Sequence, residues 1–189
     1  MIKAIIFDMD GTITKPRIDW KTLRGQIGAT PDRTIIDHIL SLDATAAEQA
    51  NRILLETEME ACIHSDLNEG VCEMLAYLRE RKTRTALVTN NHNEAVQVVL
   101  KKHGLVFDVV LSREDGAIKP SADLIQKALN ALSLRPDEVL SIGDGRYDLE
   151  ASAEIGIPFL YVTNGRPSLD YQPAVPSMVE ALAWVKDRV

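Results

Sequence analysis

Short apolar runs alternate along the chain with stretches in which apolar residues recur every three or four positions. The runs predict buried strands, and the recurring spacing predicts helices with one buried face. Strands that alternate with helices form parallel sheets. We therefore expect an α/β fold, with helices on both faces of a parallel sheet of about five strands. The expected strands cover residues 4–7, 85–88, 107–111, 139–142 and 157–162.

Helical patterns fill most of the intervals between the expected strands. One helix includes the apolar residues of 71–78, and another ends at Gly104, because glycine is favoured directly after a helix. A third covers residues 121–132, where the apolar side chains form one stripe. The last begins at Ser177, which forms a capping-box pattern with Glu180.

Residues 15–66 do not follow this alternation. They contain no apolar run typical of a strand, and their apolar residues recur at helical spacing. We interpret them as an all-helical insertion between the first strand and the rest of the sheet. Residues 1–14 and 67–189 then form the main domain, with Pro16 and the polar stretch 64–66 as expected hinges.

The composition is that of an ordinary globular protein, with 46% hydrophobic and 26% charged residues in a chain of 189. This length allows one well-buried domain and a modest insertion. The net charge of −7, without any run of Lys or Arg, argues against a nucleic-acid partner. No apolar stretch exceeds five residues, so we expect no membrane span.

The two cysteines, Cys62 and Cys72, do not have the spacing of a zinc site. The first expected strand begins at residue 4, which leaves no room for a secretory signal before it. We therefore expect two reduced thiols in a cytoplasmic protein.

The sequence Asp-Met-Asp-Gly-Thr over residues 8–12 follows directly after the first expected strand. Asp-Gly marks a turn, so two carboxylates lie at the carboxyl end of a buried strand, where open α/β sheets bind their ligands. Asp8 and Asp10 should point in different directions once the chain turns, and they can hold separate roles. A calcium-binding EF-hand loop would need Gly and Glu where this chain has Ile13 and Asp19, so that alternative fails.

Three further loops that follow expected strands carry polar side chains that match these carboxylates chemically. Thr89 and Asn90 follow the second strand, Lys119 follows the third, and Asp144 and Asp148 follow the fourth. Each alone has an ordinary structural explanation, such as a strand-end hydroxyl, a surface lysine or an acidic first-turn residue. Together, so many carboxylates need a cation to offset their repulsion. Oxygen ligands from few protein groups favour Mg²⁺, which shares its shell with water and phosphate.

Taken together, the four loops resemble those of the haloacid dehalogenase-like phosphohydrolase superfamily. The resemblance is to the branch with a small helical cap after the first strand, which includes phosphoglycolate phosphatase-like proteins. The DxDGT motif of the family matches residues 8–12, and its strand-end Thr or Ser matches Thr89. Its KP motif matches residues 119–120, and its GDxxxD motif matches residues 143–148.

The resemblance implies a Rossmann-like catalytic core over residues 1–14 and 67–189 and a helical cap over residues 15–66. It also implies a phosphatase that hydrolyses a small phosphorylated metabolite through an aspartyl-phosphate on Asp8. Asp10 would protonate the leaving oxygen and then activate the hydrolytic water. A carboxylate is a poor nucleophile toward a phosphate dianion unless positive charge neutralises both, and a covalent intermediate divides the reaction into easier steps.

The remaining matches imply the ligands of the metal and of the phosphate group. The implied Mg²⁺ ligands are Asp8, the backbone carbonyl of Asp10, and Asp144, with Asp148 supporting the metal shell. The implied phosphate-binding residues are Thr89, Asn90 and Lys119.

Other functions share parts of this pattern. A phosphomutase of the same family has all four motifs and differs in how its cap excludes water. A phosphonoacetaldehyde hydrolase-like enzyme would need a cap lysine, for which Lys15 and Lys21 are the candidates. A non-catalytic binding module on this fold would usually lack one of the acids, and none is missing here. Asp10 argues against the dehalogenase members, which have no use for an acid at that position.

Charge is distributed unevenly within the insertion. Residues 15–33 carry five basic and two acidic side chains, whereas residues 34–66 carry one basic and seven acidic side chains. The two parts could pair with each other. Alternatively, Arg17, Arg24 or Arg33 contacts a second anionic group on the substrate, because an arginine fork binds a carboxylate through two hydrogen bonds. The sequence indicates neither the substrate itself nor the oligomeric state.

Overall fold

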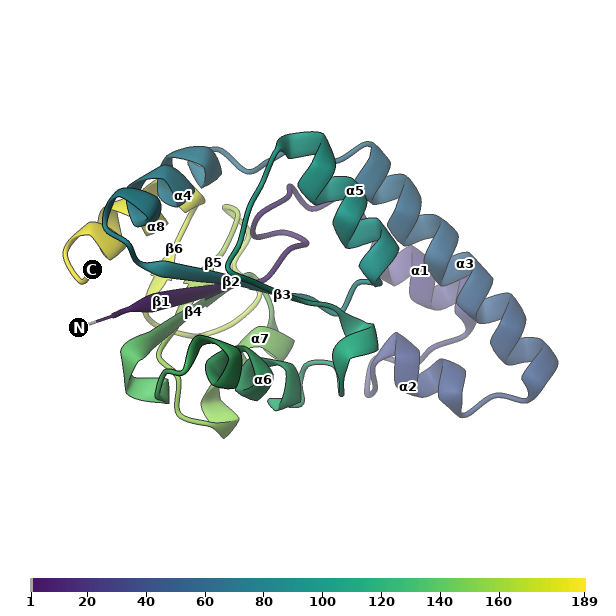
Figure 1. The fold of residues 1–189 in the computed structure, drawn as a ribbon. Helices are drawn as coiled ribbons and strands as arrows, with labels where there is room; N and C mark the ends of the chain where they lie inside the picture. Colours follow the sequence, from purple (N-terminus) through teal and green to yellow (C-terminus); the bar gives the residue numbers. More distant parts are fainter. Residues whose placement is uncertain (1) are drawn as a thin grey trace.

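A parallel sheet with helices on both faces forms the centre of the computed structural model, which describes residues 2–189 (Figure 1). The strand order is β3-β2-β1-β4-β5-β6, and every neighbouring pair is parallel. The α/β class is therefore confirmed. The strands are β1 (Ala4–Phe7), β2 (Arg84–Val88), β3 (Val109–Leu111), β4 (Val139–Gly143), β5 (Phe159–Val162) and β6 (Ala174–Val175).

The sheet differs from the expected one at its edges. The sixth strand, β6, has two residues and pairs only with the end of β5, so no apolar run marks it in the sequence. Strand β3 begins at Val109 because Phe107 packs its ring against Phe7 instead of joining the ladder. Strand β5 begins at Phe159, and the preceding Ile157 is buried in the core below the sheet.

Helices cover the two faces of the sheet unequally. On one face lie α4 (Val71–Glu80), α5 (Asn93–His103) and α8 (Met178–Lys186), and on the other lie α6 (Asp123–Leu132) and α7 (Arg146–Glu154) (Figure 1). The side chains of β1 alternate between the two cores: those of residues 5 and 7 join the first, and those of residues 4 and 6 the second. Two short 3₁₀ helices, Arg113–Asp115 and Pro136–Glu138, lie in the connecting loops.

The helix ends agree with the sequence patterns in part. Gly104 follows α5 in the left-handed conformation, as expected, and its N–H donates to the carbonyl of Leu100 in the last turn of the helix. Helix α6 begins at Asp123, two residues after the expected start. At the start of α8, Ser177 accepts the N–H of Val179, and its hydroxyl contacts the Glu180 carboxylate. The Glu180 side chain thus contacts the Ser177 hydroxyl, whereas in a full capping box it would accept the backbone N–H of Ser177.

Residues 20–63, here called the helical segment, form three helices beside the sheet: α1 (Trp20–Ile27), α2 (Ile35–Leu40) and α3 (Ala44–Ile63). Each begins after a capping side chain, from Asp19, Thr34 and Asp43 respectively. The segment has an apolar cluster of its own, and α3 packs along α5 of the main domain (Figure 1). No helix among residues 2–189 is long and apolar enough to cross a bilayer.

Two linkers join the helical segment to the sheet, and they run side by side. The Lys15 N–H bonds the Asp66 carbonyl at 2.8 Å, and the Asn68 N–H bonds the Ile13 carbonyl at 3.0 Å. Thr14 and Leu67 form an antiparallel bridge between these two bonds. We call residues 13–15 and 66–68 the paired linkers.

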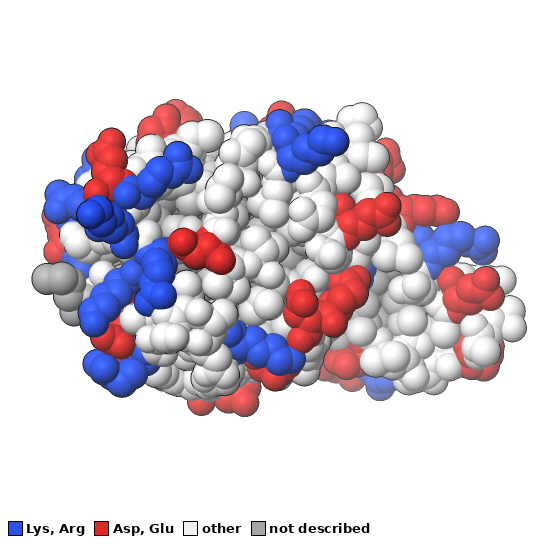
Figure 2. Space-filling view, viewed as in Figure 1, with Lys and Arg blue, Asp and Glu red and all other residues white. Residues whose placement is uncertain are grey.

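Figure 2 shows how charge is arranged on one face of the molecule. Acidic and basic side chains are interspersed there, and Lys and Arg are most frequent at the end that carries the N-terminus. Three basic residues, Arg79, Lys82 and Arg84, line a small cavity at the amino end of β2. This cavity lies at the opposite end of the sheet from the residues that the motifs single out.

Candidate active site

The strand order reverses at β1, so the crevice at the carboxyl ends of β1 and its neighbours is the expected ligand site. Asp8 directly follows β1, and its N–H bonds the Ile142 carbonyl of β4 at 3.0 Å. A cavity of about 440 Å³ opens at this point. Residues of the main domain form one wall and residues of the helical segment form the other.

Lys119 connects the end of β2, the loop after β1 and helix α7 at the base of the cavity. Its Nζ donates to Asp8 Oδ1 at 2.6 Å, to Asp148 Oδ1 at 2.5 Å and to the Val88 carbonyl at 2.9 Å. The side chain is buried, and burial alone would lower the pKa of its ammonium group. The charges of Asp148 and Asp8 prevail and raise the pKa of Lys119. The ammonium therefore stays charged, and all three of its N–H bonds are used.

The amide of Asn90 holds the Lys119 loop in place. Its Nδ2 donates to the Lys119 carbonyl, and its Oδ1 accepts the Lys119 N–H, both at 2.8 Å. The sequence predicts phosphate binding for Asn90, but both ends of its amide are occupied by this backbone. Through these two bonds Asn90 positions the loop of Lys119, and its role in phosphate binding stays a prediction. The neighbouring Thr89 lines the cavity, and its Oγ1 accepts the Asn91 N–H at 3.1 Å.

Three carboxylates meet beside Lys119. Asp8, Asp144 and Asp148 each offer an oxygen, and these oxygens lie within 4.8 Å of one another. Burial, together with the charge of Asp148, raises the pKa of Asp8 well above its usual value and that of Asp144 to about 7. Lys119 thus compensates only part of the negative charge. The side chain of Asp10, which the sequence places in the metal site only through its backbone, is outside this group.

The turn after Asp10 requires glycine and is fixed by two amides. Gly11 has a φ of +88°, and a Cβ there would lie 1.9 Å from Asp144 Oδ2. The Asn68 Nδ2 donates to the carbonyls of Gly11, Thr12 and Thr14, at 3.0, 2.9 and 3.2 Å. The Asn164 Nδ2 donates to the Gly11 carbonyl at 2.7 Å. The turn is therefore held from both the second linker and the loop after β5.

Asp10 has partners different from those of Asp8. Its Oδ2 accepts the Asn91 Nδ2 at 3.0 Å. Burial raises the pKa of Asp10 to about 6, although the Asn91 hydrogen bond lowers it, and the charge of Glu58 raises it further. A carboxyl group with this pKa can hold or release a proton near neutral pH.

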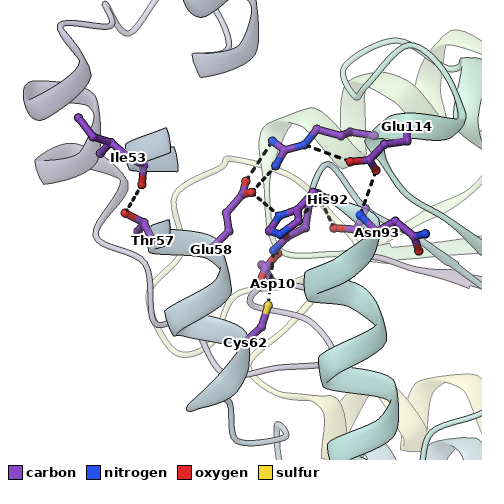
Figure 3. Close-up of polar contacts among 11 residues, drawn as sticks. Asp10, Ile53, Thr57, Glu58, Cys62, His92, Asn93 and Glu114 are labelled. Atoms are coloured by element: carbon purple, nitrogen blue, oxygen red, sulfur yellow. Dashed lines mark hydrogen bonds and ion pairs between the residues drawn. The ribbon is translucent and has the colours of Figure 1, made fainter. Parts of the chain in front are cut away.

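Glu58 reaches the main domain from α3 (Figure 3). It is buried, and its Oε2 contacts His92 Nδ1 at 2.9 Å. Its two carboxylate oxygens also accept the guanidinium of Arg113. The His92 N–H bonds Asn91 Oδ1 at 2.9 Å, so these contacts continue to the residue that holds Asp10.

The sequence analysis did not identify Glu58, Asn91 or Arg113 as parts of the site. One signal for Glu58 exists: the buried residues of α3 occur at four-residue spacing, at positions 50, 54, 58 and 62. A carboxylate on a buried helix face needs a charged partner. That partner, Arg113, is distant in sequence, and no local pattern marks it.

The three arginines proposed to contact a second anionic group lie in different places. Arg24 lines the cavity, and Nη1 of its guanidinium donates to the carbonyls of Thr30 and Arg33 at 2.8 and 3.0 Å. Arg17 does not line the cavity, because it pairs with Asp66 beside the paired linkers. Arg33 does not line it either, since its side chain turns toward α2. Of the three arginines, Arg24 is therefore the one that lies at the cavity, and its contact with a second anionic group stays a prediction.

The wall opposite the carboxylates is mostly apolar. Its members come from the helical segment and from the loop before Lys119, and they are Trp20, Pro31, Ile35, Ile36, Leu54 and Ile118. The cavity thus has a charged end at the sheet and an apolar end at the helices.

Comparison with known proteins places this fold and site in a family. A family model described as haloacid dehalogenase-like hydrolase matches residues 18–162, more than half of the chain. The chain is 25% identical over 158 residues to a haloacid dehalogenase-like hydrolase domain-containing protein of Arabidopsis thaliana, covering 78% of this chain and 64% of that relative. It is 30% identical over 174 residues to a putative pyrophosphatase PpaX of Caldanaerobacter subterraneus, covering 82% of this chain and 79% of that relative.

Solved structures have the same fold. A hydrolase from Pseudomonas syringae matches with a TM-score of 0.84 at 17% identity, covering 99% of both chains. A putative phosphoglycolate phosphatase from Lactobacillus plantarum matches with a TM-score of 0.79 at 18% identity, covering 97% of this chain and 99% of that one. With the family model over residues 18–162 and this shared fold, the chain belongs to the haloacid dehalogenase-like hydrolases.

Proposed function

We propose that this protein is a Mg²⁺-dependent phosphatase that hydrolyses a small phosphomonoester through an aspartyl-phosphate on Asp8. The contact that carries the proposal is that of Lys119 with Asp8 and Asp148, at 2.6 and 2.5 Å, in a cavity also lined by Asp144. We also propose that residues 15–66 form a cap over a catalytic core of residues 1–14 and 67–189. Both cysteines are free thiols, which supports a cytoplasmic location.

The donor set fits Mg²⁺. Asp8, Asp144 and Asp148 supply only oxygen atoms, and these three carboxylates lie beside the one ammonium group of Lys119, so negative charge is in excess there. We propose these residues, with the backbone carbonyl of Asp10, as the ones that hold the ion. When bound, Mg²⁺ supplies positive charge that offsets the repulsion between the Asp8 carboxylate and the phosphate.

In the first half of the proposed reaction, an Asp8 carboxylate oxygen attacks phosphorus and the bond to the leaving oxygen breaks. Protonated Asp10 gives its proton to that oxygen. Lys119 and the Thr89 hydroxyl hold the phosphoryl oxygens. In the second half, ionised Asp10 takes a proton from water, which attacks phosphorus and releases inorganic phosphate and Asp8. A pKa of about 6 suits a group that must alternate between these two forms.

The test is hydrolysis of 4-nitrophenyl phosphate and of a panel of phosphorylated metabolites, followed by release of inorganic phosphate. We expect release with Mg²⁺, loss with EDTA, and recovery when excess Mg²⁺ is added. Activity that resists EDTA would contradict the metal requirement. A phosphomutase would return the phosphoryl group to its substrate and release little phosphate, and a binding module would release none from any substrate.

A further inference from the structure

The apolar end of the cavity limits which alcohol a substrate can carry, an inference that rests on the proposed phosphatase function. A cavity of about 440 Å³ lies in the size range of sites for complete organic ligands. A phosphate group at Lys119 occupies only its charged end. The leaving group of the ester must therefore fill the space beside Trp20, Ile36 and Ile118.

Within residues 2–189, four cationic side chains line the cavity: Arg24, Arg113, Lys119 and Arg146. Lys119 belongs to the phosphate end. Arg113 is neutralised by Glu58, and both side chains are buried, with 11% and 4% exposed. Displacing Glu58 from this pair would leave a buried carboxylate without its partner, which is costly.

The other two arginines are also engaged. Arg24 holds the loop before α2 through the carbonyls of Thr30 and Arg33, and its Nη2 lies 3.4 Å from the Tyr147 hydroxyl. Arg146 lies at the rim, where 56% of its side chain is exposed and where it pairs with Glu150 at 3.3 Å. Arg24 pairs with no carboxylate among the described residues, but both N–H groups of its Nη1 are taken up by backbone carbonyls. A second anionic group placed among the apolar side chains of the cavity, away from Arg24, would be buried at a high desolvation cost.

We infer that the substrate is a phosphomonoester whose alcohol is apolar or aromatic. Esters such as phosphoglycolate, and pyrophosphate itself, would leave the apolar wall uncovered. Burial of an apolar alcohol against this wall removes apolar surface from water, which favours binding.

The first experiment compares kcat/KM for 2-phenylethyl phosphate, phosphoglycolate and pyrophosphate in the presence of Mg²⁺. Both esters release alkoxides of similar basicity, so a better leaving group does not explain a preference between them. We expect 2-phenylethyl phosphate to be favoured by at least about tenfold. A preference for phosphoglycolate or pyrophosphate would overturn the inference but not the proposed phosphatase function. If Arg146→Ala then removed that preference, the second negative charge of the substrate would be bound by Arg146 at the rim.

A binding experiment decides the inference even without turnover. The probe is 3-phenylpropylphosphonate, which is not hydrolysed, and the signal is the fluorescence of Trp20, with Trp20→Phe as the blank. We expect Ile36→Ser, on the cavity side of α2, to weaken binding of the probe by about five- to twentyfold. Leu40→Ser, on the same helix with 78% of Leu40 exposed, is the matched control and should leave binding unchanged. Equal affinities of the wild type, Ile36→Ser and Leu40→Ser for the probe would refute the contact between its apolar group and Ile36.

Discussion

The two walls of the cavity are built in opposite ways. The main-domain wall consists of short loops after parallel strands, and each loop contributes a charged or hydrogen-bonding group, such as Asp8, Lys119 or Asp144. The helical-segment wall is mostly apolar, and its polar members among the lining residues described are Arg24, Thr34 and Glu58. On the proposed function, this difference means that the loops of the sheet carry out the chemistry. The side chains of the helices then shape the space for the alcohol of the substrate.

The largest effect should follow from removing the nucleophile of the charged wall. Asp8→Asn keeps the shape of the side chain but cannot form an acyl-phosphate, so kcat on 4-nitrophenyl phosphate should fall by at least about a thousandfold. Asp170→Asn, at an exposed position, is the control and should retain full activity. Comparable turnover by the two variants would show that the charged wall does not act through a covalent intermediate.

Removing Asp10 should separate substrates by their leaving groups. Alkyl phosphates release basic oxygens that need a proton, so Asp10→Asn should slow their hydrolysis by about a hundred- to ten-thousandfold. Aryl phosphates leave more readily, and we expect a loss of less than about tenfold for 4-nitrophenyl phosphate. Steady-state kinetics on both substrates provide the measurement. Equal losses would mean that Asp10 has no part in protonating the leaving oxygen.

Glu58 is the exception to the contrast between the walls, because it extends from the helical side into charged surroundings. Glu58→Gln leaves Arg113 buried beside a neutral amide, and we expect the free energy of unfolding to fall by about 3 kcal/mol. Urea denaturation measures this loss. The control is Glu56→Gln on the exposed side of the same helix, which should change stability by less than about 0.5 kcal/mol.

A double variant sharpens this prediction. Glu58→Gln combined with Arg113→Gln removes both charges, so part of the lost stability should return. If Arg113→Gln lowers the free energy of unfolding of the Glu58→Gln variant as much as it lowers that of the wild type, the two side chains do not stabilise each other.

The smallest expected effect concerns carboxylate repulsion in the charged wall without metal. A carboxyl group whose pKa is raised to about 7 in the folded state, as for Asp144, binds its proton more tightly when folded. Its contribution to stability is therefore lost as pH rises from near 4 to above 7. In EDTA, Asp144→Asn should raise the stability at pH 8 by about 1–2 kcal/mol and change it little at pH 4. Thermal melting at both pH values tests this, and an unstabilised variant at pH 8 would contradict it.

The charged wall could be predicted from the sequence because its groups are local to the strands. Asp8, Thr89 and Asp144 each come directly after or at the end of a strand that an apolar run marks. The Asp-Gly turn at residues 10–11 identifies a backbone that only glycine accommodates beside Asp144. Neighbouring parallel strands then bring these separate loops together without any further information.

The apolar wall and its partners could not be predicted in this way. The pairing of Glu58 with Arg113 spans 55 residues and depends on how α3 packs along α5. Arg17 and Arg33 have the same charge as Arg24, and only the path of the loops between helices decides that Arg24 alone of the three lines the cavity. Strand β6 is defined by the edge of β5 and not by its own two residues.

The paired linkers have a consequence for how this protein can change over evolution or by design. Residues 15 and 66 are joined by one hydrogen bond of 2.8 Å, so everything between them leaves the sheet and returns to it at a single point. A stretch whose ends already meet can be lengthened, shortened or exchanged without moving the strands on which it is mounted. For the proposed phosphatase, a new alcohol preference would then need only the exchange of residues 15–66, with the sheet and its loops inherited unchanged.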